Sequence, residues 1–84
     1  MVPESTVNIP VQARLDITRD RCPMTYVRVR LALDRLAAGD VLLVELQGEE
    51  PLKNVPASAE RQGHEVVRLD RVQEGISLLW IRKR

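Results

Sequence analysis

The sequence predicts an α/β protein, a two-layer sandwich in which two helices cover one face of a four-stranded mixed sheet. Apolar and polar residues alternate ahead of the single cysteine and again near the C-terminal end, which is the period of a strand. Met24–Ala38 has neither glycine nor proline and repeats apolar residues at helical spacing. Val41–Leu46 is an almost unbroken apolar run, typical of a strand inside a sheet. The order is therefore β-α-β-α-β-β, and right-handed crossovers place both helices on the same face.

The first half of the chain is expected to hold a lead, a strand and a helix. Residues 1–12 contain two prolines and scattered polar residues, so they are expected to be a flexible N-terminal lead, with a single domain over residues 13–84. The first strand is expected over Ala13–Thr18. The first helix is expected over Pro23–Ala38, because proline suits the first helical position and Gly39 suits the position just past a helix end.

The segment after the strand Val41–Leu46 is harder to interpret. Gly48–Pro51, which includes two glutamates, is expected to be a solvated turn. Pro56 would break an established helix unless it lies in the first turn. We therefore expect a loop or single turn as far as Val55, and then a helix over Pro56–Gln62.

The C-terminal part predicts two strands joined by a turn. Glu65–Val72 is expected to place Val67 and Leu69 on one face. Ile76–Lys83 is the last expected strand. Its apolar residues divide between two faces, with Ile76, Leu78 and Trp80 on one and Leu79 and Ile81 on the other.

Composition limits the classes of function. The chain has 84 residues, 13 basic and 12 acidic, with net charge +1, so nucleic acid is not expected as a partner. Tyr26 and Trp80 are the only aromatic residues, too few for a platform that stacks bases. No segment has the length of a membrane span or the pattern of a signal peptide, and a lone cysteine forms no internal disulfide, so a cytoplasmic location is expected. His64 has no second ligand at metal spacing, and neither a metal nor a cofactor is expected.

Cys22 is the candidate for chemistry. With Pro23 at the first helical position, Cys22 becomes the N-cap, where free backbone N–H groups and the positive helix end favour the thiolate. Arg19 and Arg21 add positive charge nearby. We expect Cys22 to be partly exposed, with a pKa below the ~8.5 of free cysteine. The alternative is a buried, inert cysteine, which is common in small domains.

The first helix has two apolar faces. One is expected to face the core and is made of Tyr26, Val29, Leu33, Leu36 and Ala37. The other, which we call the apolar ridge, is made of Met24, Val27 and Leu31 and is flanked by Arg28. It rises from the turn that carries the cysteine, so it is a candidate docking surface for a partner. Packing against the second helix or the N-terminal lead is the alternative.

Several short motifs follow one another in a specific order. They are Leu15-Asp16, Arg21-Cys22-Pro23, Val29-Arg30, Gly39-Asp40, Glu50-Pro51, Val55-Pro56 and Gly63-His64-Glu65. In this order and spacing, from about Leu15 to Arg82, the chain resembles the TusA-like (SirA-like) sulfur-carrier family. The resemblance implies a βαβαββ sandwich whose cysteine carries sulfur as a persulfide, receiving it from a donor protein and passing it to an acceptor protein.

The chain departs from the family pattern at two positions. The family motif is Cys-Pro-x-Pro, whereas Thr25 stands here in place of the second proline. Arg19 stands where the family usually has glycine. Pro23 keeps the helix start, and Thr25 has an N–H and a hydroxyl that could bond the sulfur.

These features together predict a small sulfur-relay protein that uses Cys22, a sulfurtransferase-type carrier rather than a turnover enzyme. Sulfur donors and acceptors are the expected partners, and self-association is left open. The alternative is a non-catalytic binding or regulatory module of the same fold. A third hypothesis, weak RNA binding, depends only on the arginine-rich helix and tail.

Overall fold

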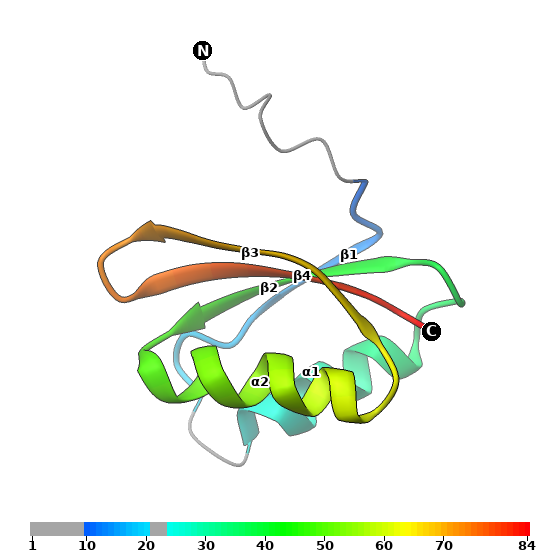
Figure 1. Cartoon of the computed structure of the whole chain (residues 1–84), viewed down its shortest axis with the longest axis horizontal. Helices are drawn as coiled ribbons and strands as arrows, with labels where there is room; N and C mark the ends of the chain where they lie inside the picture. The colour runs from blue at the N-terminus through cyan, green and yellow to red at the C-terminus, as the bar shows by residue number, and fades with distance from the viewer. Residues whose placement is uncertain (1–9, 21–23) are drawn as a thin grey trace.

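Four strands form one mixed sheet, and two helices cover one of its faces (Figure 1). The structure is a computed structural model and describes residues 10–20 and 24–84. The elements are β1 (Ala13–Asp16), α1 (Met24–Asp34), β2 (Val41–Gln47), α2 (Glu49–Arg61), β3 (Glu65–Gln73) and β4 (Ile76–Arg82). The predicted α/β sandwich and its β-α-β-α-β-β order are confirmed.

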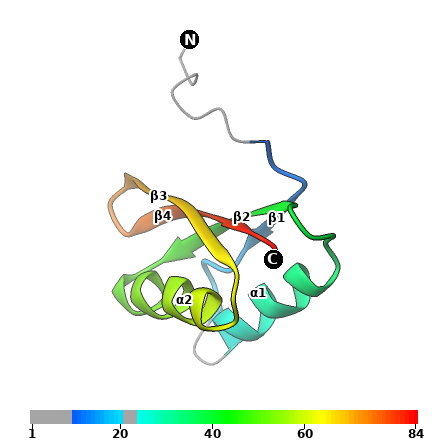
Figure 2. The same ribbon diagram turned by 45° about the vertical axis from the view of Figure 1, so that its right-hand side comes forward.

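The strand order in the sheet is β1-β2-β4-β3. β1 pairs in parallel with β2, and β4 pairs antiparallel with both β2 and β3. The last strand in the chain therefore lies between two earlier ones, and β1 and β3 are the two edges. α1 packs on β1 and β2, whereas α2 packs on β2, β4 and β3, as the turned view also shows (Figure 2).

The main core lies between the sheet and the helices. It is built from alternate residues of the strands and one face of each helix, namely Ile17, Val29, Leu33, Leu42, Val44, Leu46, Val55, Ala59, Leu79 and Ile81. A smaller cluster lies on the other face of the sheet and consists of Val41, Leu43 and Trp80, with Val11, Val67 and Leu78 against it. The predicted division of the last strand into two apolar faces is therefore confirmed.

Part of the predicted N-terminal lead is attached to the sheet. The Gln12 N–H donates to Val41 O at 3.0 Å, and Gln12 Oε1 accepts from the Val41 N–H at 2.6 Å. Residues 1–9 lie outside the described residues, so a flexible lead stays a prediction there.

β1 and α1 both end earlier than predicted. β1 ends at Asp16 rather than Thr18, because the Asp16 carboxylate accepts from the Thr18 N–H and turns the chain. α1 ends at Asp34 rather than Ala38. The Asp40 carboxylate accepts from the Ala37 N–H at 3.0 Å and holds residues 37–40 in a turn. Ala37, expected on the core face, is consequently exposed.

The end of α1 also shows that Gly39 does not cap this helix. Gly39 has φ +92°, and its N–H donates to Lys83 O at 2.8 Å, which joins the turn to the end of β4. The Lys83 ammonium donates to Leu33 O at 2.8 Å, so a cation from the C-terminal segment satisfies one of the last carbonyls of α1.

The prediction for the second helix was wrong. α2 is continuous from Glu49 to Arg61, with Pro56 inside it. Pro51 lies in the first turn, where a missing N–H has no consequence, and the two glutamates there face the positive helix end instead of forming a solvated turn. Val55 and Ala59 are fully buried on one face, and this packing outweighs the loss of one helical bond at Pro56.

β3 contains two irregularities that the sequence did not predict. Its pairing with β4 shifts between Val66 and Arg68 and again between Arg71 and Gln73, as in β-bulges. The first shift places Val67 on the face away from the helices, whereas Leu69 pairs with Leu79 on the helix face. Val67 and Leu69 therefore do not share a face, contrary to the expectation.

Candidate functional site

The candidate site lies at the carboxyl end of β1, in the connection between β1 and α1. Because β1 and β2 are parallel, their carboxyl ends lie at the same end of the sheet, and α1 and α2 both begin there (Figure 1). Two helix N-termini therefore direct their positive ends toward the same region. Arg21, Cys22 and Pro23 lie outside the described residues, so their roles stay predictions. The residues on either side of them are described.

The chain that leaves β1 is held by side-chain bonds. Asp16 Oδ1 accepts from the Thr18 N–H at 2.9 Å and from the Thr18 hydroxyl at 2.7 Å. These two bonds, with the positive charges of Arg19 and Arg28, lower the pKa of the Asp16 carboxyl below its usual range. Ile17 is buried, and its N–H donates to Glu45 O at 3.0 Å. The approach to the cysteine segment is thus anchored to the sheet.

An ion pair joins the two sides of the cysteine segment. Arg28, in the second turn of α1, donates to Asp20 Oδ2 at 2.6 Å. The Asp20 N–H donates to Ile17 O at 3.1 Å, which fixes the residue just before the segment. Residues 21–23 therefore connect two points that are tied to each other. Sequence reasoning missed Asp20, and it treated Arg28 only as a docking residue.

Arg19 occupies its position without backbone strain. Arg19 stands where the family usually has glycine, which can adopt a positive φ that is unfavourable for a bulky residue. No non-glycine residue among residues 10–20 and 24–84 has a positive φ, so Arg19 does not. The two described arginines at this end of the sheet are accompanied by two carboxylates, those of Asp16 and Asp20.

Thr25 lies on the buried face of α1. Its side chain is only 5% exposed and shares that face with Val29 and Leu33. The predicted bond from Thr25 to the sulfur involves Cys22, so it stays a prediction.

The apolar ridge is exposed, as predicted. Met24 is 48% exposed, Val27 41% and Leu31 57%. Next to it, a groove of about 220 Å³ lies between α1 and β1, lined by Leu15, Arg28, Leu31, Ala32 and Arg35. This exposure contradicts packing of the ridge on α2. Packing on the N-terminal lead stays an alternative, because residues 1–9 lie outside the described residues. Docking of a partner there stays a prediction.

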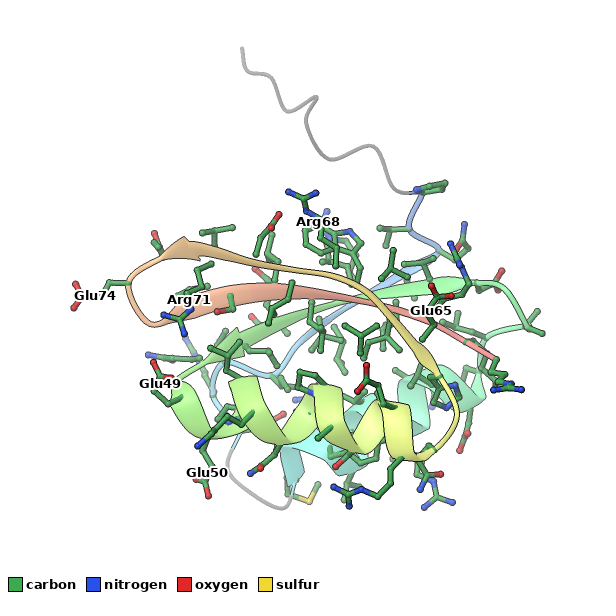
Figure 3. The ribbon with its side chains drawn as sticks, viewed as in Figure 1. Glu49, Glu50, Glu65, Arg68, Arg71 and Glu74 are labelled. Atoms are coloured by element: carbon green, nitrogen blue, oxygen red, sulfur yellow. The ribbon has the colours of Figure 1, made fainter. Side chains whose placement is uncertain are left out.

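Other polar residues lie away from this region or have a structural role. His64 Nδ1 accepts from the Arg84 N–H at 3.1 Å, and burial and the charge of Lys83 lower the pKa of His64. Glu49 and Glu50 lie at the start of α2 (Figure 3). Across the described ranges, no group of three His, Cys, Asp or Glu residues could hold a metal ion. No helix in the same ranges is long and apolar enough to cross a membrane.

The fold defines a class of protein, a small α/β sandwich in which two helices cover one face of a four-stranded mixed sheet. A family model described as "Sulfurtransferase TusA" matches residues 13–83. The chain belongs to the TusA family, which supports a role in sulfur relay.

Two individual proteins are similar to this chain. A relative from Archaeoglobus fulgidus, described as "Putative sulfur carrier protein", is 34% identical over 70 residues, which span 83% of this chain and 80% of the relative. The crystal structure of a SirA-like protein from Desulfitobacterium hafniense superimposes with a TM-score of 0.75 at 24% identity, over 84% of this chain and 96% of that chain. The latter likeness concerns the fold.

Proposed function

We propose that this protein carries sulfur as a persulfide on Cys22, between a donor protein and an acceptor protein. The observation that carries the proposal is the Asp20–Arg28 ion pair, which joins the two sides of the cysteine segment at the end of the sheet where both helices begin. A carrier needs a nucleophile held in an accessible place, and it needs no general base of its own. The TusA family match and the relative described as a sulfur carrier support the same role.

The chemistry requires only an exchange of sulfur–sulfur bonds. The Cys22 thiolate attacks the outer sulfur of a donor persulfide, the donor's S–S bond breaks, and the donor leaves as a thiolate. A new S–S bond then holds the sulfur on Cys22, and a thiolate of the acceptor takes it in the same way. No net oxidation occurs. The positive end of α1 favours the anionic forms of Cys22 in both steps.

Partner proteins are proposed to dock on the apolar ridge and the adjoining groove. The ridge offers apolar contact area, and Arg28 and Arg35 line the groove beside Leu15. A surface that combines apolar side chains with the cation of Arg35, beside an Arg28 already paired with Asp20, suits a partner segment that combines apolar and acidic residues. Transfer itself returns Cys22 to its thiol form, and a thiol that must stay free of disulfides between transfers fits the reducing cytoplasm.

Intact-mass measurement tests the carrier role. After incubation with a persulfide-generating donor such as a cysteine desulfurase and free cysteine, we expect a gain of one sulfur atom that dithiothreitol removes. The Cys22→Ser variant, incubated identically, is expected to keep its original mass. A wild-type chain that gains no sulfur from several donors, or equal gain by the variant, contradicts the proposal.

A non-catalytic binding module of the same fold is the alternative. The departures at Thr25 and Arg19 from the family pattern favour it, and Thr25, in place of the second proline, is buried at the start of α1. The mass measurement separates the two, since a module without sulfur chemistry gains no reducible mass at Cys22.

A further inference from the structure

The outer edge of β3 is a second exposed surface that the sulfur-carrier role does not use. Among the strands of the described residues β3 pairs only with β4, and two of its apolar residues, Leu69 at 42% and Val72 at 52%, are exposed. It lies at the opposite edge of the sheet from β1, and α2 rather than α1 covers its helix side. The apolar ridge and this edge are therefore separate surfaces.

The regular part of this edge is short and has a distinct charge pattern. The two register shifts leave Arg68–Arg71 as the uninterrupted stretch of β3. Arg68 and Asp70 pair with Trp80 and Leu78, so both point to the face away from the helices, where Figure 3 shows Arg68. Arg68 Nε and Asp70 Oδ2 lie 2.7 Å apart. Leu69, between them, points to the helix face.

We propose that a second copy of this chain pairs with the β3 edge, antiparallel and about a two-fold axis perpendicular to the sheet that passes beside Leu69. Arg68 of each copy then faces Asp70 of the other, and the two Leu69 side chains face each other on the helix side. The intrachain ion pair becomes a ring of four alternating charges. The two sheets become one continuous sheet, with all helices on the same face.

Charge selects this register over its neighbours. In a dimer about a two-fold axis perpendicular to the sheet, residues directly opposite each other point to the same face of the joined sheet. The axis can therefore pass beside one residue of β3 or the next, and each such move is one step of the register. One step in either direction places Arg68 opposite Arg68, or Asp70 opposite Asp70. Like charges directly opposite each other are destabilising, whereas opposite charges and apolar pairs are favourable. The register centred on Leu69 is the one in which every residue of the Arg68–Asp70 stretch meets a complementary residue.

The irregularities on either side explain why the edge does not extend this pairing further. Bulges and charged residues are the usual protection of edge strands against indiscriminate pairing. Here they confine the contact to a short stretch, so the dimer is weak and depends on charge. Because the screening length falls from about 10 Å at 0.1 M salt to about 3 Å at 1 M, added salt weakens it further.

Sedimentation equilibrium of charge-reversal variants tests the proposal. The wild-type chain is expected to approach twice its monomer mass of 9.6 kDa as concentration rises from micromolar to millimolar. Arg68→Asp and Asp70→Arg each place two like-charged pairs across the axis, so each alone raises the dissociation constant by at least about tenfold. Mixed together, the two variants restore opposite charges in both pairs and are expected to form a heterodimer.

The mixing result distinguishes the loss of a specific contact between chains from the loss of the fold. Both single variants lose the intrachain ion pair, yet an unfolded or merely destabilised chain would not regain association on mixing. Glu74→Arg, in the turn after the regular stretch, reverses a charge on the same hairpin and is expected to leave association unchanged. If the wild-type chain stays monomeric at millimolar concentration, the proposal is overturned. The β3 edge is then available to pair with a strand of another protein. A mixture that behaves as its two components also overturns it.

This inference is independent of the sulfur chemistry. The Cys22→Ser variant is expected to dimerise like the wild type, and the charge-reversal variants are expected to gain sulfur from a donor like the wild type. Failure of one proposal therefore leaves the other standing.

Discussion

Asp20 and Arg28 show how single residues shape the candidate site. Arg28 was expected to meet a partner, but its guanidinium binds Asp20 at 2.6 Å, so its first effect is on the segment between them. The pair is partly exposed, with side chains 43% and 20% accessible, and exposed ion pairs stabilise folds by only about 0–1 kcal/mol. Its significance is therefore positional, since it ties Asp20, which directly precedes residues 21–23, to α1.

Thr25 provides a residue-scale prediction about the sulfur. If Cys22 is the N-cap, Thr25 is the third helical residue, whose N–H an N-cap side chain accepts. Thr25→Pro removes that N–H and is expected to raise the pKa of Cys22, whereas Thr25→Ala keeps the N–H and changes the pKa less. The measurement is the rate of alkylation against pH for the native chain and both variants.

Folding must be controlled in this comparison, because Thr25 is buried beside Val29 and Leu33. Circular dichroism spectra that match the native chain provide that control. A lower alkylation midpoint in Thr25→Pro would falsify the role of the Thr25 N–H. It would also favour the view that the second proline of the family motif tightens a turn that Thr25 loosens.

For single residues, the sequence predicted the exposure of side chains better than the contacts between them. Exposure of Met24, Val27 and Leu31 followed from helical periodicity, which needs no knowledge of the rest of the chain. The Asp20–Arg28 pair could not be predicted, because the separation between these residues depends on the path of the segment that joins them. The glycine-to-arginine change at Arg19 looked strained on the sequence alone, and only the backbone angles show otherwise.

At the scale of elements, α1 carries a prediction about docking. Val27→Glu combined with Leu31→Glu is expected to leave the thermal unfolding midpoint nearly unchanged, because both side chains are already exposed. Sulfur transfer to an acceptor protein is expected to fall by at least about tenfold, since apolar contact is replaced by buried charge. Transfer rates measured by loss of mass from the loaded chain provide the test.

The matched control for the ridge lies on β3. Leu69→Glu with Val72→Glu makes the same chemical change at residues of similar exposure on the opposite edge of the sheet. Transfer by this second variant is expected to equal that of the native chain. If both double variants lose transfer equally, or if the ridge variant unfolds, the ridge is not a docking surface.

α2 carries a prediction about stability. Pro56 lies inside the helix and donates no N–H to the carbonyl of Leu52. Pro56→Ala restores that donor, and after allowing for the greater freedom of the unfolded chain we expect the free energy of unfolding to rise by about 1–2 kcal/mol. Pro51→Ala, in the first turn, restores no helical bond and is expected to give no such rise. Urea unfolding of the two variants compares them, and an equal effect of both would contradict the account.

The boundaries of both helices were predicted incorrectly, in opposite directions and for different physical reasons. α2 contains one proline in its first turn and one in its interior, and local propensity argues against a helix there, yet burial of Val55 and Ala59 against the sheet decides the outcome. α1 was predicted too long, because Ala37 and Ala38 are good helix formers. The Asp40 carboxylate and the contact with Lys83 end it, and both come from outside the helix.

For the whole molecule, hydrophobic pattern and crossover handedness were sufficient to predict the layers and the order of elements. The position of β4 between β2 and β3 was not predicted, because several orders of a mixed sheet satisfy the same alternation. That position decides which strands become edges. It separates β1, which lies beside the groove, from the edge strand β3, so the two proposed surfaces lie apart on one small domain.

The central place of β4 also affects how this protein is made. A ribosome synthesises β1, β2 and β3 first, and until β4 emerges β2 lacks one of its two neighbours and β3 lacks its neighbour in the sheet. Until then Leu79 and Ile81 are missing from the core, and the apolar faces of Leu42 and Val44 have too little to pack against. A prematurely terminated chain therefore offers proteases an open substrate rather than a partly working domain.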